Sequence, residues 1–530
     1  MRARRQRRRS HVFHGIPELN YFDENGASDS LARQSVRGGA ISVFARGINA
    51  ILQVGSVLFL ARLLTPEDYG LVAMVTALTG FAPVLVDMGT RDAVVQRVRI
   101  TESEVSTLFW LTVGFGCALA LTVSATSPLI ARFYHEPRLI SIVCVSSVTF
   151  IAVALTAQHQ GLLRRAVMFR ELAIIDICAN VLGAGGALVF AYFGFGYWAL
   201  VTRPVATFSF TAVGTWVCCR WRPRRPAMTR SVRDMIRFGL NLSGFSATDF
   251  VTRNSDRVTV GRSLGARSLG YYQNALFIYD NLLDLLVFPL HQVAAASLSK
   301  LQNDHPALRR SWAKALSTVA FYAMPAFGVL AVVSQDLVVM LLGSKWSNAG
   351  IILSVLALRG IPHCVERTLG WLHVAAGRTD RWFKWGLATT CVQLAVLFVG
   401  IQFGTMGVVY AYVAFMFVWF VPAIAFAGHP LGIRARDVIR VVGPQLIGAL
   451  SAAGLGFALR QAIISLPSVE RLFILSAAYM VVYLAIVVGL FRETTPVDVC
   501  LSVAHDFMPA ALKPAKRITL ARASEKHATL

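Results

Sequence analysis

Long runs of apolar residues, separated by short polar segments, repeat along most of the chain. Each run has about 20 residues, which is the length of helix that crosses the hydrocarbon core of a bilayer. The pattern therefore predicts an all-α polytopic membrane protein. The fourteen predicted helices cover residues 38–61, 70–90, 106–131, 139–160, 172–193, 197–217, 238–261, 271–296, 315–342, 349–376, 385–403, 406–427, 438–459 and 472–491.

One polar joint between two apolar runs occurs twice. The segments ARLLTPEDYG (61–70) and GRSLGARSLG (261–270) align at an offset of 200 residues, with arginine, leucine and glycine in register. In the first joint, Thr65 can cap the next helix and Pro66 can occupy its first turn. In the second joint, Gly265 permits a tight turn instead. Both joints are expected on the outer side of the membrane.

A second pair of similar segments, 164–170 and 378–384, follows the fourth and the tenth predicted helix. We therefore predict two six-helix repeats in the same orientation, followed by a terminal helix pair. The predicted organisation is a basic cytoplasmic tail (1–36), an N-terminal six-helix lobe (37–217), a basic cytoplasmic linker (218–237), a C-terminal six-helix lobe (238–428), an accessory helix pair (429–491) and a cytoplasmic tail (492–530).

The charged residues are few but strongly biased in sign and place. Hydrophobic residues make up 55% of the chain and charged residues 15%, with a net charge of +23. With a cytoplasmic N-terminus, the cytoplasmic segments hold 37 Lys and Arg and the outer segments 8. This is the positive-inside bias of membrane proteins, so both termini are predicted to be cytoplasmic. The basic excess reflects topology, and no nucleic-acid partner is expected.

The opening MRARRQRRRS carries six arginines. No short apolar region with a cleavage site follows it, so we interpret it as a disordered tail attracted to anionic lipid rather than as an export signal. The eight cysteines show no CxxC or Cys/His spacing, and the chain has no GxxxxGK[ST] loop. The sequence therefore predicts no metal, no cofactor and no catalytic residues.

Polar and charged residues inside three predicted helices are the candidate binding groups. They recur at helical spacing, so each set forms a stripe on one face of its helix. Such residues are costly at the bilayer centre and face a cavity or a partner. Mutual neutralisation, for example of Arg253 by Asp249 and Asp256, is the alternative interpretation. The candidate substrate-binding residues are Arg46, Asn49, Gln53, Asp249, Arg253, Asp256, Arg257, Arg359 and Arg367.

Several segments resemble the polysaccharide transporter family, the Wzx-type flippases of the multidrug/oligosaccharidyl-lipid/polysaccharide exporter superfamily. The resemblance runs through about residues 36–430 and is carried by LARLLTPEDYGLVAMVTA, LVDMGTRDAVVQR (85–97), RRAVMFRELA (164–173), SDRVTVGRSLGARSLGYYQNA (255–275) and VFPLHQVAAASLSKLQND (287–304). It implies two six-helix lobes forming a V. It also implies movement of undecaprenyl-pyrophosphate-linked oligosaccharide across the bacterial inner membrane, for surface polysaccharide, alongside a polymerase and export machinery.

The sequence leaves three classes of function open. A flippase would hold the pyrophosphate with interior arginines, because Arg is always charged and binds phosphate oxygens bidentately. A cation-coupled drug or metabolite antiporter of the same superfamily would use the interior carboxylates instead. A membrane glycosyltransferase or polymerase usually needs a sizeable loop or domain, and the longest outer loops have about ten residues. The flippase fits best, working by alternating access.

Overall fold

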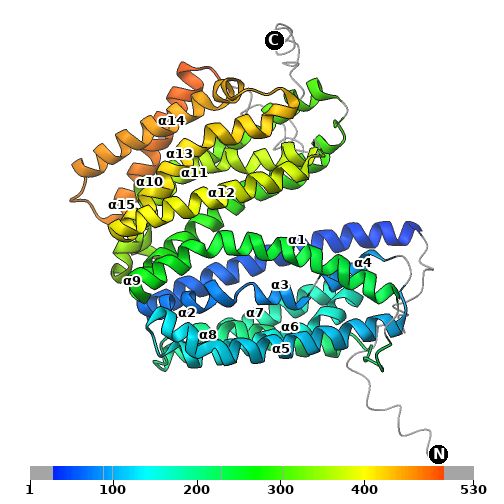
Figure 1. Ribbon diagram of the computed structural model, residues 1–530. Helices are drawn as coiled ribbons and strands as arrows, with labels where there is room; N and C mark the ends of the chain where they lie inside the picture. Colours follow the sequence, from blue (N-terminus) through cyan, green and yellow to red (C-terminus); the bar gives the residue numbers. More distant parts are fainter. Residues whose placement is uncertain are drawn as a thin grey trace, which may run out of the picture. The chain divides into compact units, whose positions relative to one another are not determined.

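The computed structural model describes residues 28–493 except 88, 98–99, 228–229, 303 and 376. Its helices follow one another along the chain as labelled in Figure 1. Within the described residues, nine helical stretches are long and apolar enough to cross a membrane, and one of them, residues 380–431, contains two helices. The chain is therefore a multi-pass helical membrane protein, as the apolar runs predicted. The expected terminal tails lie mostly outside the described residues.

The first polar joint is built as the sequence predicted. Helix α1 (Ser28–Leu63) ends there, and Thr65 caps α2 (Pro66–Thr79). The backbone N–H of Asp68 donates to the Thr65 hydroxyl oxygen at 3.3 Å, and the backbone N–H of Thr65 donates to the Asp68 carboxylate at 2.9 Å. This reciprocal cap satisfies N–H groups that the first turn of a helix leaves unbonded.

The prediction of a single helix over 70–90 was wrong. Helix α2 ends at Thr79, and two short helices follow, α3 (Ala82–Asp87) and α4 (Thr90–Gln96). Pro83 has no N–H to continue the hydrogen-bond ladder, and Gly89 adopts a left-handed conformation with φ 61°. Apolar composition alone does not reveal these breaks.

Four long helices then build the core of the N-terminal part. They are α5 (Glu102–Tyr134), α6 (Leu139–Arg165), α7 (Phe169–Tyr192) and α8 (Trp198–Cys218). Helix α5 packs on α6, α7 packs on α8, and α6 also contacts α8 (Figure 1). Helix α1 packs on α7.

The basic linker is an ordered segment on the end of α5. We call residues 219–227 the strap; they are non-helical, and Trp221 within them is buried. The backbone N–H groups of Arg224 and Ala227 donate to the Ser106 and Thr107 hydroxyls of α5 at 3.0 and 2.8 Å. The linker predicted from sequence, 218–237, includes the strap and the first residues of the helix that begins at Arg230.

The second polar joint is a break inside one long helix. Helix α9 (Arg230–Ser299) contains a non-helical residue, Gly265, with φ 79° and ψ 175°. This is the position at which the sequence predicted a turn between two helices. A side chain is strained at this φ, so glycine is required there.

The two joints cross each other through their matching glycines. A Cβ atom on Gly70 would overlap the carbonyl oxygen of Ala266, and a Cβ on Gly270 would overlap the carbonyl oxygen of Pro66. The contact is reciprocal, since Ala266 stands 200 residues after Pro66 just as Gly270 stands 200 after Gly70. The repeated motif therefore marks a pseudo-symmetric helix crossing at which two backbones meet without side chains between them. We call this contact the glycine crossing.

A tryptophan locks the segment next to the glycine crossing. Trp346 is fully buried, and its indole N–H donates to the carbonyl of Ala61 at 2.8 Å. Its ring meets those of Tyr69 and Tyr271 edge-on, at centroid distances of 5.2 and 6.1 Å. Arg62 donates to the carbonyl of Met340 at 2.7 Å and to that of Leu341 at 3.0 Å. Residues from the first joint, Tyr271 directly after the second joint, and the 340–346 segment therefore pack together.

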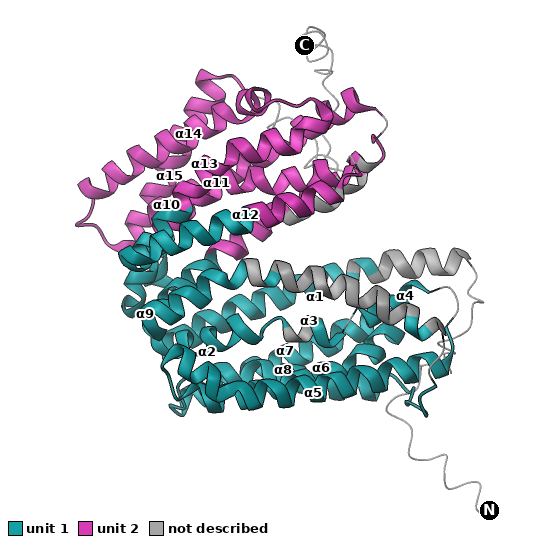
Figure 2. Ribbon diagram, in the orientation of Figure 1, with its two compact units in different colours: residues 1–278, 335–353, 389–412 teal, residues 279–334, 354–388, 413–530 magenta. Residues whose placement is uncertain are grey.

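The chain divides into two compact units (Figure 2). Unit 1 comprises residues 1–278, 335–353 and 389–412, and unit 2 comprises 279–334, 354–388 and 413–530. The remaining helices are α10 (His305–Leu342), α11 (Ser347–Ala375), α12 (Thr379–Gly400), α13 (Gly404–Gly428), α14 (Ala435–Ala462) and α15 (Ser468–Leu484), which continues as a π-helix over Ala485–Leu490.

In unit 2 the terminal helix pair packs on α10. The Tyr483 hydroxyl donates to the carbonyl of Phe321 at 2.8 Å. A Cβ atom on Gly328 of α10 would overlap the Tyr479 hydroxyl, and one on Gly456 of α14 would press on Val332. Small residues thus let these helices approach closely, as is usual in membrane helix packing.

The glycine crossing predicts that Gly70→Ala and Gly270→Ala destabilise the protein to similar degrees. Each methyl would meet a backbone oxygen that cannot rotate away, and overpacking of this kind costs about 1–3 kcal/mol or more. Thermal unfolding of the purified protein, with yield of monodisperse protein as a second measure, tests this. Gly114→Ala in α5 is the matched control, because the added methyl there meets no atom within 4 Å. Unfolding temperatures for Gly70→Ala or Gly270→Ala equal to that of the control would contradict the reciprocal contact.

Candidate functional site

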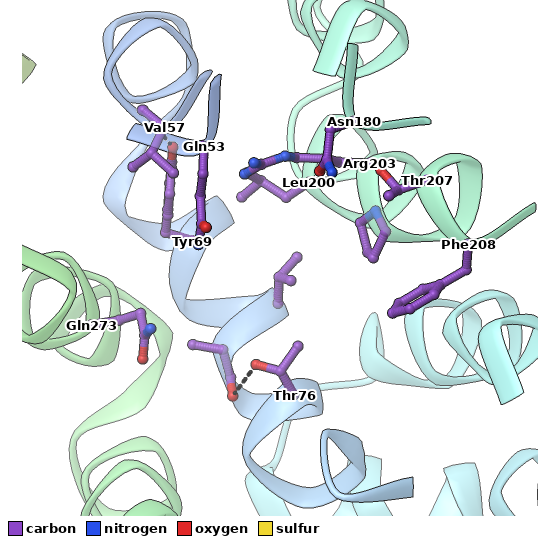
Figure 3. A pocket seen from close by; sticks show the side chains of 13 residues that line it. Gln53, Val57, Tyr69, Thr76, Asn180, Leu200, Arg203, Thr207, Phe208 and Gln273 are labelled. Carbon is purple, nitrogen blue, oxygen red and sulfur yellow. Dashed lines mark hydrogen bonds between the residues drawn. The ribbon is translucent and has the colours of Figure 1, made fainter. Parts of the chain in front are cut away.

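A polar cavity of about 390 Å³ lies within unit 1 (Figure 3). Its walls come from α1, α2, α7 and α8, with one residue from α9. Six of the thirteen lining residues are apolar, and the other seven carry amides, hydroxyls and one guanidinium. The lining residues are Gln53, Val57, Tyr69, Val72, Ala73, Thr76, Asn180, Leu200, Arg203, Pro204, Thr207, Phe208 and Gln273.

The wall formed by α1 and α2 is fixed by the first joint. The Tyr69 hydroxyl donates to the carbonyl of Val57 at 3.1 Å, which ties the start of α2 to α1. The guanidinium of Arg203 extends from α8 toward Gln53 of α1 (Figure 3). Asn180 of α7 donates its amide to the Asn49 side-chain oxygen at 3.2 Å and to the Asp176 carbonyl at 2.9 Å. The polar stripe of α1 therefore meets α7 at the edge of the cavity.

The wall formed by α7 and α8 depends on one glycine. A Cβ atom on Gly183 would overlap the Thr207 hydroxyl and would stand 3.0 Å from the carbonyl oxygen of Arg203. Glycine thus lets α7 approach α8 at the level of Arg203. Pro204, the next residue, has no N–H to donate to the Leu200 carbonyl. The Leu200 carbonyl, which lies beside the cavity, therefore lacks its usual hydrogen bond within the helix.

Arg203 dominates the electrostatics of this cavity. No aspartate or glutamate lies among the thirteen lining residues. Across the part of the chain that the structure describes, no carboxylate forms an ion pair with Arg203. The amides of Gln53, Asn180 and Gln273 and the hydroxyl of Thr207 add neutral donors. An isolated charge in a membrane interior is expensive, so a cavity with one cation and no acid favours an anion.

The predicted site residues on α1 divide between the cavity and its edge. Gln53 lines the cavity, and Asn49 reaches it through its bond to Asn180. Arg46, one turn earlier, is exposed and does not line it.

The predicted residues on α9 lie outside the lining of this cavity. Asp256 is buried and accepts a hydrogen bond from the Tyr272 hydroxyl at 2.7 Å. Arg257 donates to the Asn254 side-chain oxygen at 2.6 Å, and Arg253 is exposed. The side chain of Asp249 lies outside the described residues.

The two predicted residues on α11 belong to unit 2. Arg359 stacks its guanidinium over the ring of Tyr279 at 5.9 Å, and both Arg359 and Arg367 are half-buried. Among the nine predicted residues, the structure thus brings one into the cavity lining and a second to its edge.

Sequence reasoning missed Arg203, although the residue was evident as a charge inside an apolar run. It stands alone on its helix, so no polar stripe marked it. Its partners in the lining come from helices far apart in the sequence. The useful signal was the adjacent Pro204, since proline next to a charge inside a membrane helix indicates a locally open backbone.

The chain is similar in sequence to proteins of polysaccharide biosynthesis. Residues 59–350 match the family described as "Polysaccharide biosynthesis protein". The teichuronic acid biosynthesis protein TuaB of Bacillus subtilis is 27% identical over 88% of this chain and 97% of its own length. The lipopolysaccharide biosynthesis protein WzxC of Escherichia coli is 27% identical over 72% of this chain and 78% of its own.

Among solved structures, an inward closed conformation of the lipid II flippase MurJ superposes with a TM-score of 0.68 at 14% identity. The superposition covers 86% of this chain and 99% of that one. At this identity the likeness shows a shared fold and leaves function to the site. The family match covers more than half of the residues, so the chain belongs to the polysaccharide biosynthesis protein family.

Proposed function

We propose that this protein is a flippase for lipid-linked oligosaccharides. It would move undecaprenyl-pyrophosphate-linked repeat units from the cytoplasmic to the outer leaflet of the bacterial inner membrane, for a surface polysaccharide. Membership of the polysaccharide biosynthesis family and the names of TuaB and WzxC support the pathway. The fold shared with MurJ supports a transporter rather than an enzyme.

The observation that carries the proposal is the acid-free cavity around Arg203. A pyrophosphate cannot enter hydrocarbon without compensation for its charge. A guanidinium stays protonated and offers a planar fork of donors that fits two phosphate oxygens. A cation antiporter would instead need a carboxylate in the same position. The sign of the cavity's charge therefore favours an anionic cargo.

The neutral donors of the cavity have a second role in this proposal. Asn180 and Gln53 lie beside Arg203, and Gln273 lies on the other side of the cavity (Figure 3); all three can bind the hydroxyls of the first sugar. The lipid tail would remain in the acyl layer throughout. The head group would cross as the cavity opens to each side of the membrane in turn.

Arginines predicted from sequence have a supporting role in this proposal. In unit 1, Arg46, Arg253 and Arg257 would attract the anionic head group or guide it. In unit 2, Arg359 and Arg367 would do the same. Asn49 and Asp249 would contact sugar hydroxyls. Asp256, which is bound by Tyr272, would hold the local structure of α9.

The proposal includes an orientation and partners. Both termini would be cytoplasmic, because the lysine and arginine bias places the strap and the other basic segments inside. A polysaccharide polymerase and the export machinery would take up the cargo on the outer side. No nucleic acid or cofactor is involved.

We expect Arg203→Gln to reduce flipping of a fluorescent undecaprenyl-pyrophosphate disaccharide in proteoliposomes by about tenfold or more, because a hydrogen bond to a charged group contributes about 1.5–3 kcal/mol. Arg203→Lys should retain part of the activity, since it keeps the charge and loses the fork. Arg132→Gln, which removes an exposed arginine at the end of α5, is the matched control. Wild-type flipping in Arg203→Gln at normal abundance would refute the role of the cavity.

The orientation is tested by labelling with a membrane-impermeant thiol reagent on intact cells. A cysteine in place of Arg267, at the second joint, should react, whereas one in place of Arg225 in the strap should not; both side chains are exposed. The unaltered chain gives the background from its eight native cysteines. If only the Arg225 variant reacted, the orientation of the protein would be the opposite of the one proposed.

A further inference from the structure

A buried tyrosine, a histidine and a glutamate form a line of polar groups inside unit 2. The hydroxyl of Tyr279, on α9, lies 2.6 Å from Nδ1 of His363 on α11. The other ring nitrogen, Nε2, lies 3.9 Å from a carboxylate oxygen of Glu366, one turn further along α11. A histidine is thus placed between a phenol and a carboxylate in the apolar interior of a membrane protein.

The exposure of the three groups increases along the line. Tyr279 is 1% exposed, the His363 side chain 12% and the Glu366 side chain 31%. Phe327 of α10 closes the inner end, with its ring 5.3 Å from that of Tyr279. Gly360 permits this packing, because a Cβ atom there would overlap the Phe327 ring. Glu366 is therefore the most accessible of the three groups, and His363 lies between it and the buried tyrosine.

The surrounding charges nearly cancel. Among the described residues, the charged or titratable side chains close to Tyr279 are Arg359, Arg367 and Cys364 from α11 and Asp280 from α9. Tyr483 of α15 adds a neutral phenol near Cys364. Helix α10 contributes Phe327 here and has no charged residue between Lys314 and Asp336. With Glu366 and Asp280 against Arg359 and Arg367, the protonation state of His363 decides the net charge of the cluster.

The hydrogen-bond geometry allows two states of the ring. In the neutral ring Nε2 carries the hydrogen, because it faces a carboxylate oxygen, and Nδ1 accepts from the Tyr279 hydroxyl. When a proton from water binds at Nδ1, that N–H donates to the tyrosine oxygen, and the phenolic hydrogen turns away. Nε2–H then faces Glu366 as one half of an ion pair. The tyrosine serves as donor in one state and acceptor in the other.

We infer that Tyr279, His363 and Glu366 form a proton-binding site that links transport to pH. The inference rests on the transport function proposed above. Histidine is the side chain whose ordinary titration range includes physiological pH. Ionisable groups inside a membrane protein often form proton relays. An added proton would give this cluster one net positive charge, so proton binding and the approach of an anionic head group would reinforce each other.

Proton binding can be measured without cargo. We expect the full-length protein, labelled with ¹⁵N-histidine and placed in lipid nanodiscs, to show one histidine that changes from the neutral Nε2–H form to the imidazolium between pH 9 and pH 5. The signal should be missing in His363→Gln, which identifies it. A His363 signal that stays neutral over this range would overturn the inference, whatever the transport assay gives.

Transport variants test the link. The rate of flipping of the fluorescent disaccharide lipid by the wild type should change by up to about tenfold per pH unit on the limb that one proton controls. His363→Gln keeps a group that can bond to both neighbours, and it should flatten the profile. Glu366→Gln should move the midpoint to lower pH, because the imidazolium loses its counter-charge. Tyr279→Phe should do the same more weakly, since the lost bond is stronger to the charged ring.

A matched control separates this site from a general effect of histidine. His373 on the same helix is also buried, and its ring contacts that of Phe426. His373→Gln should keep the wild-type profile. A wild-type profile in His363→Gln would overturn the link. A titrating His363 in a protein that flips no lipid-linked sugar would sustain the proton site and instead refute the proposed cargo.

Discussion

The glycine crossing is the constraint on which the cavity depends. Two backbones meet where Gly70 faces Ala266 and Gly270 faces Pro66, and no side chain could stand between them. Tyr69 directly precedes one glycine, and Gln273 follows the other by three residues; both line the cavity. A close backbone contact thus fixes the position of two walls. The cap at Thr65 and the hydrogen bond from Trp346 to the Ala61 carbonyl stabilise the first joint itself.

The two units differ in the charges that they hold in their interiors. The cavity of unit 1 leaves Arg203 without an acid in its lining, so its charge is available to a ligand. The cluster around His363 in unit 2 contains cations and carboxylates together, so its charge is adjustable by a single proton. Fixed charge suits recognition of a fixed anion, and adjustable charge suits coupling. In a low-dielectric interior both effects are stronger than they would be in water.

The sequence predicted the helical class, most helix positions and the cap at Thr65, because these depend on local apolar length and on neighbouring residues. The repeat offset also located the glycines that meet at the crossing. The breaks after Thr79 were missed because the apolar run continues through them. The fixed path of the strap was missed because its partners, Ser106 and Thr107, lie more than 100 residues away. Arg203 and the pairing of Tyr279 with His363 were missed for the same reason: isolated residues gain their meaning from distant helices.

The strap limits where this protein can be modified. Its row of exposed arginines makes it look like a free connector into which a fluorescent protein or an affinity tag could be placed. Yet Trp221 is buried, and the backbone that follows it is bonded to α5 at Arg224 and Ala227, so an inserted domain would disturb both anchors. Tolerance to insertion follows burial and backbone hydrogen bonding rather than charge.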